Sequence, residues 1–101
     1  MISIKPGVKL DERMAMPLAT LIVHECFQDY GCNLVITSGI EGSHGENSLH
    51  YKGLALDYRT RDIPVGFHKG LIAKVRWALG DQFDVVAEPT HLHVEFDPKR
   101  G

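Results

Sequence analysis

The sequence lacks the features of several protein classes. Its 101 residues carry a net charge of −2, with acids and bases interspersed. A nucleic-acid-binding domain needs a basic face and a membrane-surface protein needs a lysine- and arginine-rich patch, so neither is expected. The longest apolar stretch, residues 18–23, is interrupted by Thr20 and is far too short to span a bilayer. We therefore expect no nucleic acid partner and no membrane insertion.

Cysteine is also scarce, with only Cys26 and Cys32 present. A cysteine-rich structural zinc site normally brings paired CxxC spacing, which these two residues do not form. The N-terminus has no charged segment followed by an apolar one, so it does not resemble a secretory signal. We expect synthesis in the cytoplasm, with two reduced thiols favoured over a disulfide. If the substrate lies outside the cell, another agent must deliver the protein.

What remains is the composition of one small globular domain over residues 1–101. Hydrophobic residues make up 44% and charged residues 24%, the usual balance for a chain that buries a core. Apolar residues at spacings of three and four predict helices over 11–30 and 65–79. Pro17 interrupts the first pattern, so the regular helix is expected to begin near this residue, where proline is tolerated. Trp77 is expected to be partly buried on the second helix.

Short β-branched and aromatic runs predict a small sheet. The expected strands are residues 34–37, 54–59, 83–87 and 91–96. Two helices packed on a small, mainly antiparallel sheet form an α+β domain. The glycine-rich segment 38–48 is expected to be a loop.

Groups that can bind a metal or transfer a proton gather in three separated segments, 48–50, 53–57 and 88–93. Together they offer imidazoles and a carboxylate, the ligand types of a catalytic zinc, and a spare carboxylate that can act as a base. Three protein ligands leave the fourth tetrahedral position for water, which distinguishes a catalytic zinc site from a structural one. The segments therefore predict one Zn²⁺ per chain.

Strand geometry explains how these segments could meet. His91 and His93 alternate on the last predicted strand, so both rings point to one face of the sheet. Asp57 lies on another predicted strand, and Gly53 permits a tight turn that brings His50 back over it. The competing interpretation is that these are ordinary surface or core histidines, because spacing alone is not specific.

Two motifs resemble a known family. Residues 48–57, SLHYKGLALD, resemble the SxHxxGxAxD signature of the zinc D-Ala-D-Ala carboxypeptidases and endopeptidases, and 91–93 resemble their closing HxH. The stretch 42–62 is also similar to the signalling domain of Hedgehog proteins, which shares this fold. The resemblance covers residues 34–98. It implies the Hedgehog/D-Ala-D-Ala-peptidase-like fold and hydrolysis of peptides with D-residues, as in the stem or cross-link of bacterial peptidoglycan.

The resemblance also implies residue roles. His50, Asp57 and His93 correspond to the zinc ligands, Glu88 to the catalytic carboxylate, and His91 to an imidazole that stabilises the transition state. A second assignment stays open, because some carboxypeptidases of the family end in an EPWH motif whose histidine binds zinc. Residues 88–91 resemble that motif too, which would exchange the roles of His91 and His93.

Two further residues are expected at the substrate cleft. His44 precedes His50 by six positions, where Hedgehog domains also carry a histidine, and Ser48 opens the first motif. The alternative for His44 is a loop residue with no part in the site. Both are therefore candidates for substrate contact only.

One departure from the family concerns the bond that is cleaved. Carboxypeptidases of this type carry an arginine after the first strand, in an SGYR-like motif that can hold the substrate carboxylate. The corresponding residues 38–41 end in Glu41, which would repel a terminal carboxylate. Arg59 and Arg61 are possible substitutes, although each is more typical of a solvated surface charge. The choice between carboxypeptidase and endopeptidase therefore remains open.

The sequence as a whole predicts a monomeric zinc metallopeptidase that acts on peptidoglycan peptides and is encoded by a phage or prophage. It would act on the cell wall after release or as part of a virion. The alternative is a non-catalytic zinc-binding recognition domain, or a virion structural domain, of the same fold. The presence of Glu88 favours the enzyme, because a structural zinc needs no base.

Overall fold

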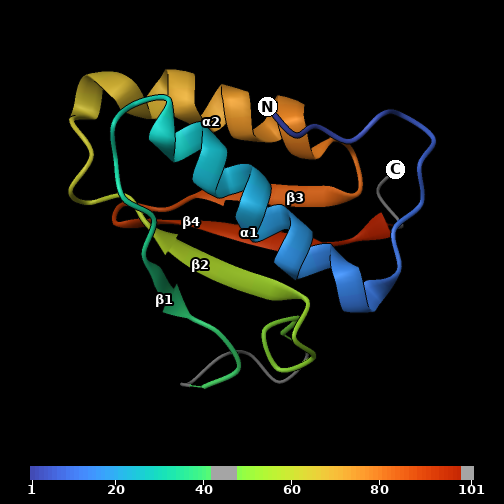
Figure 1. Ribbon diagram of the computed structural model, residues 1–101. Coiled ribbons are helices and arrows are strands. Elements are labelled where there is room, and N and C mark those ends of the chain that lie inside the picture. The colour runs from blue at the N-terminus through green and yellow to red at the C-terminus, as the bar shows by residue number, and fades with distance from the viewer. Residues whose placement is uncertain (42–47, 99–101) are drawn as a thin grey trace.

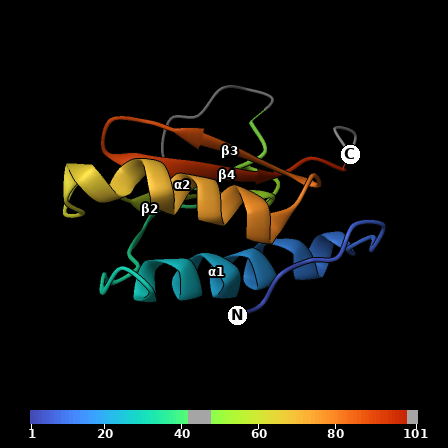
Figure 2. The same ribbon diagram turned by 90° about the horizontal axis from the view of Figure 1, so that it is seen from above.

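Two helices lie on one side of a four-stranded antiparallel sheet in the computed structural model, which describes residues 1–41 and 48–98 (Figure 1, Figure 2). In chain order the elements are α1 (Glu12–Gln28), β1 (Ile36–Ser38), β2 (Ala55–Arg59), α2 (Val65–Leu79), β3 (Phe83–Ala87) and β4 (His91–Phe96). The sheet has the order β1-β2-β4-β3, and every neighbouring pair is antiparallel. The predicted α+β class is therefore confirmed.

Helix α1 begins earlier than the proline suggested. Asp11 caps it, because its side chain accepts a hydrogen bond of 2.8 Å from the backbone N–H of Arg13, and Glu12 adds an acid to the first turn. Pro17 lies inside the helix, so the expected start near Pro17 was wrong. The proline side chain is exposed, and the helix is held by its opposite face, which buries Ala15, Met16, Ala19, Ile22, Val23, Cys26 and Phe27.

Helix α2 has the predicted bounds and ends at Gly80, whose positive φ of 80° is a backbone angle that glycine adopts without strain. Its buried face consists of Leu71, Val75, Ala78 and Leu79. Trp77 points away from that face and is 71% exposed, so the expectation that it is partly buried was wrong. Neither of the two described helices is long and apolar enough to cross a membrane.

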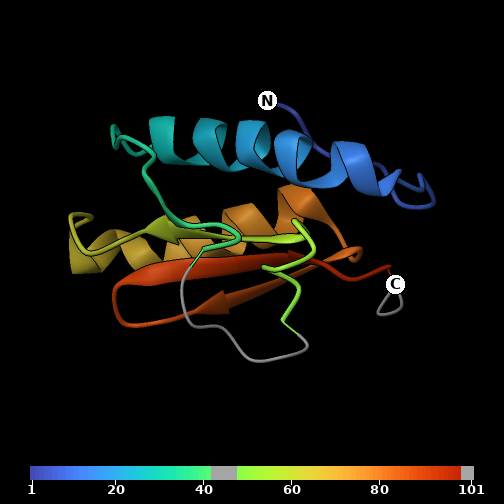
Figure 3. The same cartoon turned by 90° about the horizontal axis from the view of Figure 1, so that it is seen from below.

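The core lies between the helices and the near face of the sheet. Strand β4 buries Leu92, Val94 and Phe96 toward the helices, whereas the residues between them point to the other face. On β2, the Tyr58 hydroxyl lies 2.8 Å from the Thr20 hydroxyl of α1 and joins sheet to helix. Figure 2 and Figure 3 together place α1 and α2 on the same side of the sheet, so neither described helix covers the opposite face.

Candidate metal centre

Side chains of His50, Asp57 and His93 converge on the face of the sheet opposite α1 and α2. His50 Nε2 lies 3.3 Å from Asp57 Oδ1, and His93 Nδ1 lies 3.0 Å from the same oxygen. The two imidazole nitrogens are 3.1 Å apart. Three potential ligand atoms from three segments of the chain therefore surround one point, and this group could hold a metal ion.

Strand pairing brings two of the three side chains together. Asp57 on β2 and His93 on β4 are direct cross-strand partners, so their side chains stand next to each other on the same face. The neighbouring pair, Arg59 and His91, occupies the next position on that face. A shift of register by one residue would turn His93 and Asp57 to opposite faces, so the antiparallel ladder itself specifies this half of the cluster.

A single tight turn supplies the third side chain. The backbone N–H of Gly53 donates to the carbonyl of His50 at 3.0 Å, and that of Leu54 donates to Leu49 at 2.9 Å. This pattern requires a left-handed residue, and Gly53 has φ of 72°, which confirms its predicted role. The Ser48 hydroxyl accepts a hydrogen bond of 3.2 Å from the N–H of His50. Ser48 thus helps to orient the turn, and its contact with substrate stays a prediction.

Hydrogen bonds on the outer side of each ring determine which nitrogen faces the cluster. His50 Nδ1 lies 2.9 Å from the Gly39 carbonyl oxygen, which can only accept, so Nδ1 carries the hydrogen and Nε2 presents a lone pair. His93 Nε2 donates to Glu95 Oε1 at 2.8 Å, and its Nδ1 faces the cluster. Each ring is thus oriented as a metal-binding histidine normally is, with an oxygen acceptor behind it.

The spacing of the three atoms also fits a small cation. Ligands bound at about 2.0–2.1 Å in a tetrahedron lie roughly 3.3 Å from one another. The observed separations of 3.0, 3.1 and 3.3 Å are close to that value. Two imidazoles and one carboxylate are a donor set that zinc accepts.

Burial removes most of the solvent from the cluster, so its charged groups need partners of opposite charge. His50 is 2% exposed and Asp57 is 9% exposed. Burial lowers the pKa of His93, but its hydrogen bonds to Glu95 and Asp57 raise it more, so the pKa of His93 lies above its ordinary value. The Asp57 and Glu95 carboxylates on either side of the ring therefore favour positive charge at this point, which a bound cation would also supply.

The two expected catalytic residues lie at the end of the β3–β4 hairpin. His91 Nε2 is 3.8 Å from Asp57 Oδ2, farther than the nitrogen of His93, so the group that forms contains His93 and not His91. The N–H of Glu88 donates to the carbonyl of His91 at 2.9 Å. Glu88 is exposed and lies two positions beyond Val86, the cross-strand partner of His93. The catalytic roles of Glu88 and His91 stay predictions.

Other predicted site residues lie near the turn of His50 or outside the described chain. His44 falls within 42–47, outside the described residues. The Glu41 carboxylate accepts a hydrogen bond of 2.8 Å from the N–H of Gly39, the residue whose carbonyl holds His50. Arg59 shares the face of Asp57 and lies 3.8 Å from the Asp62 carboxylate. An acid is therefore fixed beside the cluster, and an arginine stands at its other end.

Sequence reasoning missed two partners of the cluster, Glu95 and the carbonyl of Gly39. A signal for Glu95 was present, because it follows His93 by two residues on a strand and must share its face. No signal pointed to Gly39, since a backbone carbonyl carries no residue-type information.

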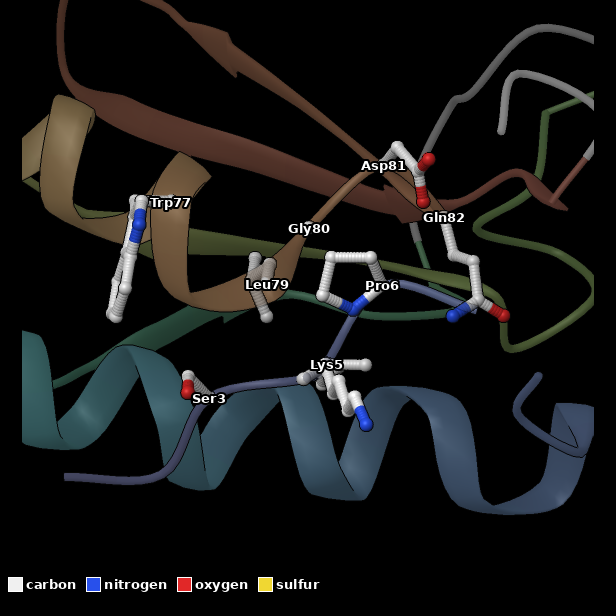
Figure 4. A pocket seen from close by; sticks show the side chains of 9 residues that line it. Ser3, Lys5, Pro6, Trp77, Leu79, Gly80, Asp81 and Gln82 are labelled. Atoms are coloured by element: carbon white, nitrogen blue, oxygen red, sulfur yellow. The ribbon is translucent and has the colours of Figure 1, made fainter. Parts of the chain in front are cut away.

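A separate groove of about 510 Å³ lies between the N-terminal segment and the end of α2. Figure 4 shows Trp77 on one side of it and Pro6 on the other, with Leu79 between them. None of its lining residues belongs to the metal cluster. The exposed indole thus belongs to a different surface from the candidate centre.

Comparison of the chain with protein-family models, with curated proteins and with solved structures found no match. The functional interpretation therefore depends on the chemistry of His50, Asp57 and His93 and on the residues around them.

Proposed function

We propose that the protein is a zinc-dependent peptidase that hydrolyses peptide bonds in the stem or cross-link peptides of bacterial peptidoglycan. We further propose the Hedgehog/D-Ala-D-Ala-peptidase-like fold, a monomeric state and a phage or prophage origin. The observation that carries the proposal is the buried group of His50, Asp57 and His93, with its ligand atoms 3.0–3.3 Å apart. The motif resemblance of residues 48–57 and 91–93 also supports a zinc-dependent peptidase.

The proposed metal site uses His50 Nε2, Asp57 Oδ1 and His93 Nδ1. Zinc bound by three protein ligands supplies an activated water at neutral pH and polarises the scissile carbonyl. The rest of the reaction falls to side chains of this chain. The carboxylate of Asp57 also offsets part of the cation's charge, so that two neutral imidazoles complete the set.

Glu88 and His91 are the proposed catalytic residues. Glu88 takes a proton from the attacking water and transfers it to the leaving amine, a role that requires a carboxylate at the edge of the site. His91 donates a hydrogen bond to the oxyanion that develops on the scissile carbonyl, a contribution worth about 3 kcal/mol in comparable sites. Their neighbouring positions on the β3–β4 hairpin are consistent with action on one bond.

Glu41 favours an internal peptide bond over a C-terminal one. Its carboxylate is anchored to the N–H of Gly39, next to the carbonyl that orients His50. A substrate carboxylate in this region would meet a fixed negative charge instead of an arginine. We therefore propose endopeptidase cleavage, for which no free carboxylate needs to be bound.

The second candidate is a zinc-binding recognition domain, or a virion structural domain, without turnover. The missing arginine at residues 38–41 favours it, because the substrate clamp of the resembling carboxypeptidases is lost. Glu88 favours the enzyme, because neither recognition nor a structural role requires a general base.

Incubation with purified peptidoglycan distinguishes the two candidates. The protein with added zinc should release peptide fragments that mass spectrometry identifies, and a chelator should stop the release. Glu88→Gln should bind zinc but release at least about 100-fold less peptide. Glu12→Gln, the same change at an exposed acid of α1, should leave release unchanged. Zinc binding without any release by the unaltered protein would support the recognition domain instead.

A further inference from the structure

We propose that Glu95 is a positioning residue of the metal centre, which fixes His93 so that Nδ1 and not Nε2 binds the metal. This inference rests on the proposed function of the cluster as a metal site. Glu95 Oε1 lies 2.8 Å from His93 Nε2, and on the other side of the ring Nδ1 lies 3.0 Å from Asp57 Oδ1. The imidazole is therefore held at both nitrogens, between one carboxylate inside the cluster and one outside it.

The chemistry of the ring makes this arrangement directional. A neutral imidazole has one N–H and one lone pair, and an ionised carboxylate can only accept. Glu95 therefore selects the form with hydrogen on Nε2 and leaves the lone pair of His93 on Nδ1. The same rule applies to His50, where the Gly39 carbonyl takes the Nδ1 hydrogen and leaves the lone pair on Nε2.

The strand geometry explains why His93 needs such a partner. Its ring projects from β4 beside that of His50, with ring centroids 4.9 Å apart and planes inclined by 52°. Rotation of the His93 ring about its Cβ–Cγ bond would exchange Nδ1 with a ring carbon and carry Nδ1 away from Asp57. The bond to Glu95, two residues along the same strand, resists that rotation because both side chains stand on one face.

The partner behind His50 is the neutral carbonyl of Gly39, whereas the partner behind His93 is the charged carboxylate of Glu95. A carbonyl orients its histidine without adding charge, whereas the Glu95 carboxylate also makes the imidazole of His93 a stronger donor. The side chains of Glu95 and His93 are only 23% and 22% exposed, so solvent weakens this effect little. Glu95 thus acts on the metal through His93 and makes no contact of its own with the three ligand atoms.

Zinc titration of three variants and of the unaltered protein tests the proposal. Glu95→Ala should weaken zinc affinity about 10–100-fold, the range for removal of such a partner. The zinc affinity of Glu95→Gln should lie between those of Glu95→Ala and the unaltered protein, because the amide oxygen still accepts a hydrogen bond from Nε2 but carries no charge. Asp81→Asn, a charge change in the turn after α2, should bind zinc as the unaltered protein does.

A second measurement separates positioning from general stability. Ring ¹⁵N spectra of the zinc-loaded protein should show His93 with hydrogen on Nε2, and Glu95→Ala should lose that uniform pattern. The melting temperature of each metal-free variant reports any loss of fold. The proposal is overturned if Glu95→Ala binds zinc within about twofold of the unaltered protein, or if affinity falls only as far as metal-free stability does. Absence of zinc binding by the unaltered protein overturns the metal site as well, so the two failures are distinguishable.

Discussion

His50 and His93 present different ring nitrogens to one point: Nε2 of His50 lies 3.1 Å from Nδ1 of His93. The difference follows from their origins, because His50 approaches from a turn above the sheet and His93 rises from a strand within it. Each ring is anchored at its other nitrogen, by Gly39 and by Glu95. Two acceptor nitrogens and a buried carboxylate this close are unfavourable without a proton or a cation between them.

Zinc should therefore stabilise the fold. A free concentration 100 times the dissociation constant adds about 2.7 kcal/mol, which corresponds to a rise in Tm of roughly 10–20 °C for a domain of this size. Calorimetry with zinc and with chelator measures the change. His50→Ala should abolish the response, and equal melting temperatures in both conditions for the unaltered protein would contradict a metal at this site.

Removal of His91 and of His93 should have different effects. His91→Ala should keep one zinc per chain and lose about 10²–10³-fold in peptide release, because the predicted role of His91 is to stabilise the transition state. His93→Ala should lose the metal, since Nδ1 of His93 is one of the three clustered atoms. Elemental analysis and peptide release measure the two effects. A zinc-free His91→Ala protein would instead assign the ligand role to His91.

Glu41 should influence which substrates are accepted. Repulsion by a solvent-exposed charge is worth about 0.2–1 kcal/mol, so Glu41→Gln should shift the preference toward peptides with a free C-terminal carboxylate by up to about fivefold. Competition between a peptide acid and its amide measures the ratio. Glu12→Gln is the matched control, and the shift should shrink at high salt. An unchanged ratio would remove Glu41 from the specificity of the site.

Replacement of Gly53 tests the turn that carries His50, and replacement of Gly66 in α2 is its control. A Cβ at either position meets no atom within 4 Å, but only Gly53 has a positive φ. Gly53→Ala should destabilise the fold by about 1–2 kcal/mol through backbone strain and should weaken zinc binding. Gly66→Ala, within α2, should stabilise by about 0.5–1 kcal/mol and leave zinc affinity unchanged. Urea unfolding and zinc titration measure both, and similar effects of the two variants would contradict the proposed importance of the turn.

Alkaline pH should destabilise the protein through Cys26. Burial raises the pKa of this thiol from an ordinary value of 9.0 to about 11. Between these values the folded chain keeps a proton that the unfolded chain has lost, so the free energy of unfolding should fall as pH rises, by at most about 1.4 kcal/mol per pH unit. Below pH 9 the contribution is fully present. Urea unfolding of the unaltered protein and of Cys26→Ala across this range should differ in slope, and parallel curves would contradict the assignment.

Periodicity in the sequence predicted α2 and the strands β3 and β4 with their observed bounds, because each is a short amphipathic segment that packs on one side only. The same reasoning failed at Pro17, where the buried face of α1 outweighs one lost backbone hydrogen bond. It also failed at Trp77, whose position on α2 points away from the core although its size suggests burial. The spacing of apolar residues along a helix does not determine which of its faces the rest of the fold covers.

The cluster itself was predictable in part. Alternation on β4 and the tight turn at Gly53 indicated how His50, Asp57 and a histidine of β4 could meet, and the motif resemblance implied that this histidine is His93. The register of β2 and β4 pairs His93 with Asp57 and so favours His93 over His91 independently of the resemblance. The Gly39 carbonyl required the fold, since the contact joins residues 11 apart through a backbone atom.

The residues of strand β4 alternate between the core and the candidate metal site. Leu92, Val94 and Phe96 belong to the hydrophobic core, while His91, His93 and Glu95 stand on the reverse side and are not among the core residues. Replacements at the latter three positions therefore alter the candidate metal site without changing a core side chain. The strand is a natural starting point for engineering new chemistry on this scaffold.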